Sequence, residues 1–371
     1  PAYVITRSSP FTEDINPWQE RHRLPKLTGG LLGEIAYANA PVLIDDLPAR
    51  LRDDDPGRFY LEGYQSLIAL PVYDDGEGMN ITVMLAKSQE EIDRARVPMM
   101  HWQASLFGRG TNNQVLRNRL SEALANLNRE LQVVGEIQRS LLPRALPTID
   151  GVELAAHYET SARAGGDYYD FFPLANGHWG IFIADVSGHG TPAAVLMAIT
   201  HAIAHAQPGT HTPPATMLGS LNAQLARTYT REGTFITAFY AVLDPAKRTL
   251  TYSRAGHNPP RLVRDGAVIT LDANGALPLG IVEEQAYEES IIQLERGDRL
   301  LLYTDGITEA LEPARGSATR ELFVVERLDR LLLDHPEDSA AGSVDRIREA
   351  VNAFTGHTAT DDQTVIAMHL K

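Results

Sequence analysis

Short apolar runs alternate with turn residues through the second half of the chain, and each run has the length of a β-strand. Four of these runs predict two hairpins, 235–243 with 249–254 and 261–263 with 267–271. The second hairpin is closed through Asp265-Gly266, and Asp-Gly is a favoured two-residue turn. A Thr-Pro pair before residues 193–205 predicts a helix start. Mostly antiparallel strands with few helices predict two packed sheets flanked by helices.

Residues 1–111 have the pattern of a separate α+β unit. Their apolar runs predict three strands and a closing helix, at 36–47, 64–73, 79–86 and 89–108. The second and third strands are separated by Asp-Asp-Gly-Glu-Gly (74–78), which predicts a hairpin turn.

Residues 112–144 connect the two regions and carry a single apolar stripe. The stripe consists of Leu116, Leu120, Leu124, Leu127, Leu131 and Val134, followed by Ile137 and Leu141. Alternating steps of four and three residues are typical of a coiled-coil seam, with one irregularity between Val134 and Ile137. A long helix with one apolar stripe needs a partner, and a parallel homodimer is favoured over a partner within the chain. Pro143 ends the helix.

Composition limits the classes of protein to which the chain can belong. A length of 371 residues predicts two to three domains. The absence of cysteine excludes disulfides and the cysteine-dependent phosphatases, and the net charge of −15 argues against nucleic-acid binding. No stretch approaches eighteen uninterrupted apolar residues, and the N-terminus lacks a secretory pattern, so no membrane span and a cytoplasmic location are expected.

Four aspartates stand in short motifs of the second half of the chain. They are Asp167 in Ala-Gly-Gly-Asp-Tyr-Tyr-Asp, Asp185 in Ala-Asp-Val-Ser-Gly-His-Gly, Asp305 in Tyr-Thr-Asp-Gly and Asp361 in Thr-Asp-Asp-Gln-Thr. The last three adjoin predicted strands, and strand ends bring distant residues to one edge of a sheet. Two like charges at ~4 Å repel by ~1 kcal/mol in water and by ~4 kcal/mol at an effective dielectric constant of about 20. Such a cluster therefore needs cations, and oxygen ligands suit magnesium, manganese or calcium.

Several neighbouring residues are weaker candidates. Asp170 is expected to be a turn residue or a support for a ligand, and Asp362 is an alternative to Asp361 because adjacent strand residues point in opposite directions. The twelve histidines contain no His-Glu-x-x-His motif. His189 and His257 are candidates for general acids, and a structural hydrogen-bonding role is the favoured interpretation for each. Arg163 and Arg254 are either phosphate contacts or solvated surface residues. Ser187 is not expected to be a nucleophile, since Gly-x-Ser-x-Gly is absent.

The four motifs, in this order, resemble the SpoIIE-like branch of the PPM metal-dependent serine/threonine protein phosphatases. The resemblance covers residues 145–371 and implies an α-β-β-α sandwich with two divalent ions, Mn²⁺ or Mg²⁺. It implies that Asp185 ligates both ions and that the other ligands divide between them. Asp167 and the carbonyl of Val186 would serve one ion, and Asp305 and Asp361 the other. Asp361 is preferred to Asp362 by analogy with the family's paired residues.

Residues 1–111 resemble a GAF domain in the order of their predicted elements, with a PAS-like or unrelated α+β module as the alternative. Together the resemblances imply a phosphatase that is regulated by a sensor domain and acts on a phosphorylated protein. The substrate that the family resemblance implies is a STAS-fold anti-sigma-factor antagonist. The GAF-like domain either binds a small molecule, such as a cyclic nucleotide or a non-covalently held bilin, or serves only in dimer contacts. The rival hypothesis is a catalytically inactive, dimeric ligand-sensing scaffold.

Overall fold

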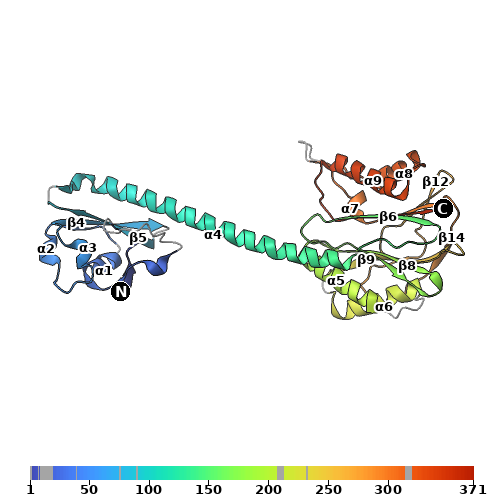
Figure 1. Ribbon diagram of the computed structural model, residues 1–371, viewed down its shortest axis with the longest axis horizontal. Helices are drawn as coiled ribbons and strands as arrows, with labels where there is room; N and C mark the ends of the chain where they lie inside the picture. Colours follow the sequence, from blue (N-terminus) through green and yellow to red (C-terminus); the bar gives the residue numbers. More distant parts are fainter. Residues whose placement is uncertain are drawn as a thin grey trace. The chain divides into compact units, whose positions relative to one another are not determined.

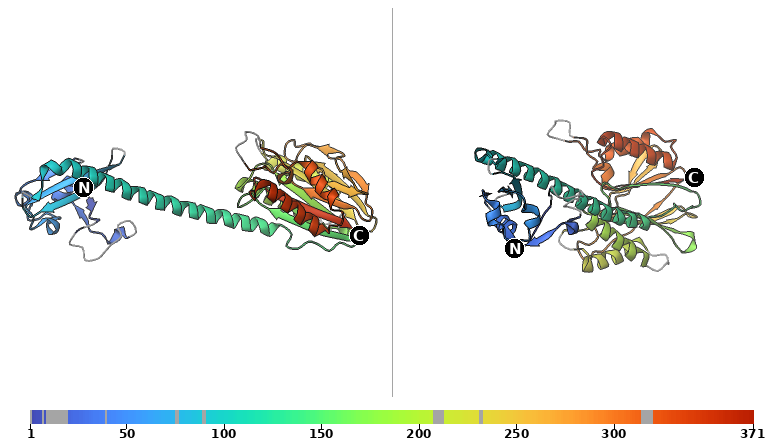
Figure 2. Two further views of the ribbon diagram at one scale, coloured as in Figure 1. Left: turned by 90° about the horizontal axis from the view of Figure 1, so that it is seen from above. Right: turned by 60° about the vertical axis from the view of Figure 1, so that its left-hand side comes forward.

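A computed structural model describes residues 2–6, 8, 20–38, 40–74, 77–88, 91–206, 213–230, 233–313 and 320–371. The chain divides into two compact units, Pro1–Asn126 and Leu127–Lys371, which are considered separately (Figures 1 and 2). Within the described parts of the chain, no helix has the length and apolar character needed to cross a membrane.

The second unit is built on two mainly antiparallel sheets. Its strands are β6 (Val152–Glu159), β7 (Tyr168–Pro173), β8 (Trp179–Val186), β9 (Ile236–Asp244), β10 (Thr249–Ala255), β11 (Arg261–Arg264), β12 (Ala267–Thr270), β13 (Gly275–Ala276), β14 (Ser290–Gln293), β15 (Arg299–Tyr303) and β16 (Gln363–Leu370). One sheet has the order β13-β10-β9-β8-β7, with β14 also paired to β10, and the other has the order β12-β11-β15-β16-β6. Both predicted hairpins are confirmed, as β9–β10 and β11–β12.

Helices cover the outer faces of these sheets. They are α5 (Thr191–Ala206), α6 (Pro214–Thr228), the short α7 (Asp305–Thr308), α8 (Val325–Asp334) and α9 (Ala340–Thr355). In Figure 1, α5 and α6 lie on one side of the paired sheets and α8 and α9 on the other. Side chains alternate along β15 accordingly: Leu300 and Leu302 belong to the core shared by the two sheets, whereas Leu301 and Tyr303 pack against α8 and α9. The result is an α-β-β-α arrangement.

A single helix, α4 (Val97–Leu141), runs through the region predicted to hold a closing helix and a separate linker. The predicted boundary at residue 111 is therefore not a break in the helix: the glycines at positions 108 and 110 disfavour helix but do not end it, and no proline lies between Pro98 and Pro143. Four leucines of the predicted seam are about half exposed in this chain: Leu116 (51%), Leu120 (61%), Leu124 (50%) and Leu127 (52%). The coiled coil itself stays a prediction.

The first unit contains a small antiparallel sheet. Its elements are β1 (Ala2–Val4), β2 (Lys26–Thr28), α1 (Gly30–Tyr37), β3 (Val42–Ile44), α2 (Leu47–Arg50), α3 (Arg58–Leu61), β4 (Ser66–Asp74) and β5 (Glu77–Ala86), with single 3₁₀ turns at Arg21–Arg23 and Arg94–Arg96. The predicted hairpin is confirmed as β4–β5, although residues 75 and 76 of its turn lie outside the described residues.

Two predicted elements of this unit have different bounds. The strand expected over 36–47 is confined to β3, because Ala36 and Tyr37 complete α1, whose buried side chains include Leu32 and Ile35. Of the helix expected over 89–108, residues 89 and 90 lie outside the described residues, and the α-helical part begins at Val97. The three-stranded sheet β3-β4-β5 is consistent with an α+β module, and the GAF-like identity stays a prediction.

Candidate metal centre

Asp167 and Asp185 lie side by side at one end of adjacent strands. Tyr168 of β7 pairs with Ala184 of β8 in an antiparallel register, so the residue before Tyr168 lies opposite the residue after Ala184. That register places Asp167 next to Asp185. The pairing is imposed by strands in which residues 181–184 are all buried, which leaves little freedom for the register to slip.

Asp167 also connects this sheet edge to the second sheet. Its Oδ2 accepts hydrogen bonds from the hydroxyls of Thr304, at 2.8 Å, and Thr364, at 2.6 Å. Thr304 follows β15 and Thr364 lies in β16, so both belong to the opposite sheet. The other carboxylate oxygen of Asp167, Oδ1, is buried and has no hydrogen-bond partner within the described part of the chain. An oxygen in this position is available to a cation.

Asp305 and Asp361 complete the acidic cluster from the second sheet. Tyr303 of β15 pairs with Val365 of β16, and the backbone N–H of Thr304 donates to the carbonyl of Thr364 at 3.1 Å. Asp305 directly follows Thr304 at the first position of α7, and Asp361 lies two residues before β16. The end of the second sheet therefore carries two carboxylates beside the two from the first sheet.

Burial and mutual proximity raise the pKa values of three of these carboxyls. Burial, followed by the neighbouring charges of Asp167, Asp305 and Asp361, raises the pKa of Asp185 far above its ordinary value. Burial likewise raises the pKa of Asp167, against the opposing effect of the hydrogen bond from Thr364. Burial and the charge of Asp361 raise the pKa of Asp305 to about 6. Without cations, the folded protein therefore favours protonated carboxyls here.

Asp362 has a different task from its neighbour Asp361. One of its carboxylate oxygens accepts from the backbone N–H of Ser161 at 2.8 Å, and the other accepts from the backbone N–H of Gly166 at 2.6 Å. Asp362 is 3% exposed, whereas Asp361 is exposed. Asp362 thus holds the loop before Asp167 in place, and its two oxygens are already engaged.

Glycines allow the close approach of these loops. A Cβ on Gly306 would lie 1.9 Å from the carbonyl oxygen of Asp362, and one on Gly166 would lie 2.8 Å from the carbonyl oxygen of Val186. Side chains larger than hydrogen therefore do not fit at either position. The arrangement keeps the space around the Val186 carbonyl free of side-chain atoms from the Asp167 loop.

The end of α4 contacts the same loop. Gln138, 3% exposed, accepts from the backbone N–H of Gly165 at 2.9 Å and donates to the carbonyl of Gly165 at 2.5 Å. Because Gly165 precedes Asp167 by two residues, one side chain of the helix fixes both polar backbone groups of a site-forming loop.

The contacts of the other candidate residues distinguish their roles. His257 is buried, bonds Thr237 Oγ1 through Nδ1 at 2.9 Å, and has its pKa lowered to about 3 by burial, so the favoured structural role fits it better than acid catalysis. The Ser187 hydroxyl accepts from the backbone N–H of Phe235 at 2.9 Å. Arg254 donates to the carbonyls of His257 and Asp272, at 2.9 and 3.1 Å. His189 and Arg163 are exposed.

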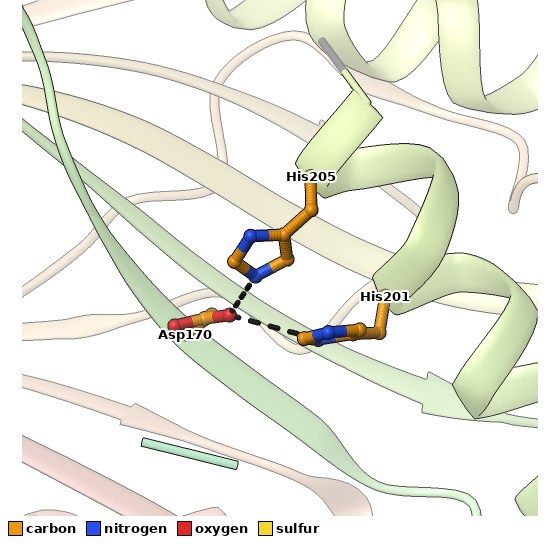
Figure 3. A group of neighbouring side chains, drawn as sticks. All are labelled: Asp170, His201 and His205. Carbon is orange, nitrogen blue, oxygen red and sulfur yellow. Dashed lines mark hydrogen bonds and ion pairs between the residues drawn. The ribbon is translucent and has the colours of Figure 1, made fainter. Parts of the chain in front are cut away.

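Asp170 belongs to another cluster, which the sequence analysis missed. Its Oδ2 lies 2.7 Å from His205 Nε2 and 3.8 Å from His201 Nδ1, both from α5 (Figure 3). Asp170 lies in β7, three residues beyond Asp167, which directly precedes that strand, and an odd separation along an extended chain directs the two side chains to opposite faces. The available signal was the four-residue spacing of the two histidines on a predicted helix, which is a metal-binding spacing even outside His-Glu-x-x-His.

Comparison with known proteins decides the family. A family model described as Stage II sporulation protein E (SpoIIE) matches residues 175–371, more than half of the chain. The chain belongs to the SpoIIE family. The matched part of this SpoIIE-family protein includes Asp185, Asp305 and Asp361, and it begins after Asp167.

Relatives of this SpoIIE-family protein extend the match. It is 30% identical over 246 residues to "Phosphoserine phosphatase RsbU" of Bacillus subtilis, which covers 65% of this chain and 70% of the relative. It is 29% identical over 252 residues to "Phosphoserine phosphatase RsbP" of the same organism, covering 66% of this chain and 59% of the relative. The SiaA-PP2C domain of Pseudomonas aeruginosa has the same fold, with a TM-score of 0.58 and 23% identity, over 67% of this chain and 99% of that domain.

These matches place the SpoIIE-family protein among the PP2C-type protein serine/threonine phosphatases, enzymes that depend on Mn²⁺ or Mg²⁺. The residues present fit that requirement. An all-oxygen donor set suits hard divalent ions, and the buried Oδ1 of Asp167 lacks a partner within the described part of the chain.

Proposed function

We propose that the four aspartates hold two divalent ions between the ends of the two sheets. Asp185 would contact both ions, because its neighbours are Asp167 from its own sheet and Asp305 and Asp361 from the other. Asp167 and the carbonyl of Val186 would serve one ion, and Asp305 and Asp361 the other. The engagement of both Asp362 oxygens with backbone N–H groups supports Asp361 as the ligand of that pair.

The bound ions supply activation of the attacking water and neutralisation of charge on the phosphoryl group. The chain's own contribution is to keep the carboxylates at fixed separation. The hydroxyls of Thr304 and Thr364 orient Asp167 by holding one oxygen and directing the other into the cluster. Asp362, which directly precedes β16, accepts hydrogen bonds from the backbone of the Asp167 loop and so holds that loop against the end of β16.

The proposed substrate is a phosphoserine or phosphothreonine on a partner-switching regulator. RsbU and RsbP, the relatives named above, are phosphoserine phosphatases by name. A STAS-fold anti-sigma-factor antagonist is the substrate that the family resemblance implies. The side chains of Asp361 and His189 are exposed, so this end of the sandwich is reachable by a loop of another protein.

Regulation is assigned to the first unit and the long helix. The first unit contains a cavity of about 560 Å³ whose lining includes Tyr3, Tyr60, Tyr64 and Ile81, which is the size of a small-molecule site. The half-exposed leucines of α4 would pair in a homodimer, and Gln138 would relay a change in the helix to the Asp167 loop. These three assignments complete the sensor-phosphatase proposal.

The exposed seam gives the dimer a direct test. Leu120→Asp with Leu124→Asp places charges in the seam and should convert a dimer into a monomer in light scattering. Matched substitutions on the opposite helix surface, Arg119→Asp with Glu122→Asp, should leave the mass unchanged. A wild-type monomer over the concentration range of the assay would remove the dimer from the proposal.

The function is tested by incubating the full chain with phosphorylated STAS-fold antagonists and with a generic phosphoester, with and without Mn²⁺. Metal-dependent release of phosphate from both supports the enzyme, and a large preference for one antagonist identifies the substrate. The alternative, an inactive dimeric scaffold, predicts binding of the antagonist with no phosphate release under any divalent ion.

A further inference from the structure

The Asp170 cluster is a set of three donor groups on the face of β7 that packs against α5. The ligand atoms of Asp170, His201 and His205 all lie within 4.8 Å of one another. Figure 3 shows both imidazoles on the same side of α5, directed toward one oxygen of the carboxylate. Their rings are 4.2 Å apart between centroids. Residues four apart on a helix share a face, which explains why the two histidines meet the same strand residue.

The carboxylate of Asp170 is held in a fixed orientation. Its Oδ1 accepts from the backbone N–H of Phe171 at 2.7 Å, and its Oδ2 accepts from the hydroxyl of Tyr168 at 2.7 Å. Hydrogen bonds of this kind to a ligating carboxylate are typical of metal sites, because they set the direction of the remaining lone pair. Asp170 is only 7% exposed, so water competes little for these two hydrogen bonds.

The two imidazoles have the exposure that ligation needs. The side chains of His201 and His205 are 20% and 46% exposed, which leaves one side of the cluster open to a water molecule. Two imidazole nitrogens and one carboxylate oxygen with an open position suit zinc and its transition-metal neighbours better than Mg²⁺.

We propose that Asp170, His201 and His205 form a further metal site, separate from the four-aspartate centre, that takes one Zn²⁺-like ion. The site lies on the opposite face of β7 from Asp167 and does not depend on the proposed function. A bound ion would join β7 to α5, the helix that follows the Asp185 loop. The competing state is a hydrogen-bonded network alone, in which His205 pairs with Asp170 and the Tyr168 hydroxyl lies 3.1 Å from His201 Nδ1.

Cobalt spectroscopy on the full chain distinguishes these states. The chelator-treated protein is saturated with Mg²⁺ and then titrated with Co²⁺, whose visible ligand-field bands report nitrogen ligation. The titration is run on the wild type, His201→Ala, His205→Ala and Asp170→Asn. His335→Ala is the matched control, because the His335 side chain is 34% exposed, between the values of the two candidate ligands. Asp185→Ala tests independence from the four-aspartate centre.

We expect one equivalent of Co²⁺ with intense bands in the wild type, in Asp185→Ala and in His335→Ala. Removal of any one of the three ligands should weaken Co²⁺ binding at least about tenfold. Zn²⁺ should raise the unfolding temperature of the wild type and leave that of His205→Ala unchanged, with folding of each variant checked by its unfolding transition in chelator. Absence of the bands from the wild type, or equal bands in His205→Ala, would overturn the site and leave an ion pair in its place.

Discussion

Asp167 and Asp170 are three residues apart in one motif, yet their carboxylates differ in how fully their oxygens are hydrogen-bonded. One Asp167 oxygen is held by two threonine hydroxyls, and the other is buried without a partner in the described part of the chain. Both Asp170 oxygens accept hydrogen bonds, and two imidazoles lie beside one of them. The unfilled, buried oxygen of Asp167 among other acids calls for a cation, whereas the Asp170 carboxylate has hydrogen-bond donors whether or not an ion is bound.

The difference arises from strand geometry. Side chains separated by an odd number of residues point to opposite faces of β7, so Asp167 faces the second sheet and Asp170 faces α5. One strand therefore supports two polar clusters with different ligand chemistry, oxygen on one face and mixed oxygen and nitrogen on the other. Substitutions on the two faces should affect different properties of the protein.

The largest effect is expected on the oxygen-only face. Asp185→Ala or Asp305→Ala should lower turnover at least about a thousandfold, because each loses several kcal/mol of metal-dependent transition-state stabilisation. Mn²⁺-dependent phosphate release measures this loss. The exposed Asp334 on α8 provides a control, Asp334→Ala, that should retain wild-type turnover. Full activity in Asp185→Ala would refute the metal assignment.

A smaller effect is expected from the groups that orient Asp167. Thr304→Val and Thr364→Val keep the shape of the side chain and remove the hydroxyl that donates to Asp167. Each should weaken Mn²⁺ affinity or turnover by about 10- to 100-fold, the usual range for groups that support a ligand. Thr364→Ser retains a hydroxyl and should recover most of the loss in a Mn²⁺ titration of activity. Equal defects in Thr364→Val and Thr364→Ser would show that packing, rather than the hydrogen bond, is responsible.

The acidic face also predicts a pH dependence of the metal-free protein. The pKa of Asp305 is raised from 3.8 to about 6, so the folded state holds a proton that the unfolded state releases more readily. The free energy of unfolding should therefore fall as pH rises from about 4 through about 6, and further as Asp167 and Asp185 ionise.

Thermal unfolding in chelator at pH 5 and pH 8 measures this effect. The unfolding temperature should be lower at pH 8 by about 3 °C or more, since each kcal/mol corresponds to about 2–4 °C in a domain of this size. Mg²⁺ should reduce the difference by satisfying the ionised carboxylates. The same slope in Asp305→Asn and the wild type would indicate that other groups control it.

On the α5 face, substitutions should change stability and leave turnover unaffected. Asp170→Asn keeps the size of the side chain but weakens its bonds to Tyr168 and His205. In chelator, the free energy of unfolding should fall by about 1.5–3 kcal/mol, the usual contribution of a hydrogen bond to a charged group. Urea unfolding measures the change, and Asn in place of the exposed Asp334 is the matched control. A change below the error of the control would mean that the network contributes nothing to stability.

The sequence was sufficient to place three of the four aspartates beside strand ends and to predict the hairpins β4–β5, β9–β10 and β11–β12, but not the order of the strands in either sheet. Asp185, Asp305 and Asp361 each adjoin a strongly apolar run, and local pattern is enough to predict a strand and its end. The contacts of Thr364 with Asp167 and of Ser161 with Asp362 join residues about two hundred positions apart. No local pattern predicts such pairings, so the preference for Asp361 over Asp362 rested on the family resemblance, and the contacts of Asp362 now support it.

The α5 face and the first unit were less predictable for separate reasons. The four-residue helical spacing of His201 and His205 is visible in the sequence. Their partner Asp170 lies in a motif in which Asp167 was already the predicted ligand, so nothing connected Asp170 with the two histidines. In the first unit, Ala36 and Tyr37 have strand-like composition, yet burial of Leu32 and Ile35 against the sheet makes them the last turn of α1. Tertiary packing outweighed local preference there.

The most direct test of the central claim is the dependence of hydrolysis on bound metal. The full chain is stripped with chelator, titrated with Mn²⁺, and assayed on a phosphoserine peptide while bound Mn²⁺ is counted. Two Mn²⁺ ions per chain, with turnover absent before they bind and neither binding nor turnover normal in Asp185→Ala, is the predicted result. Hydrolysis by the metal-free protein, or unchanged Mn²⁺ binding in Asp185→Ala, would contradict it.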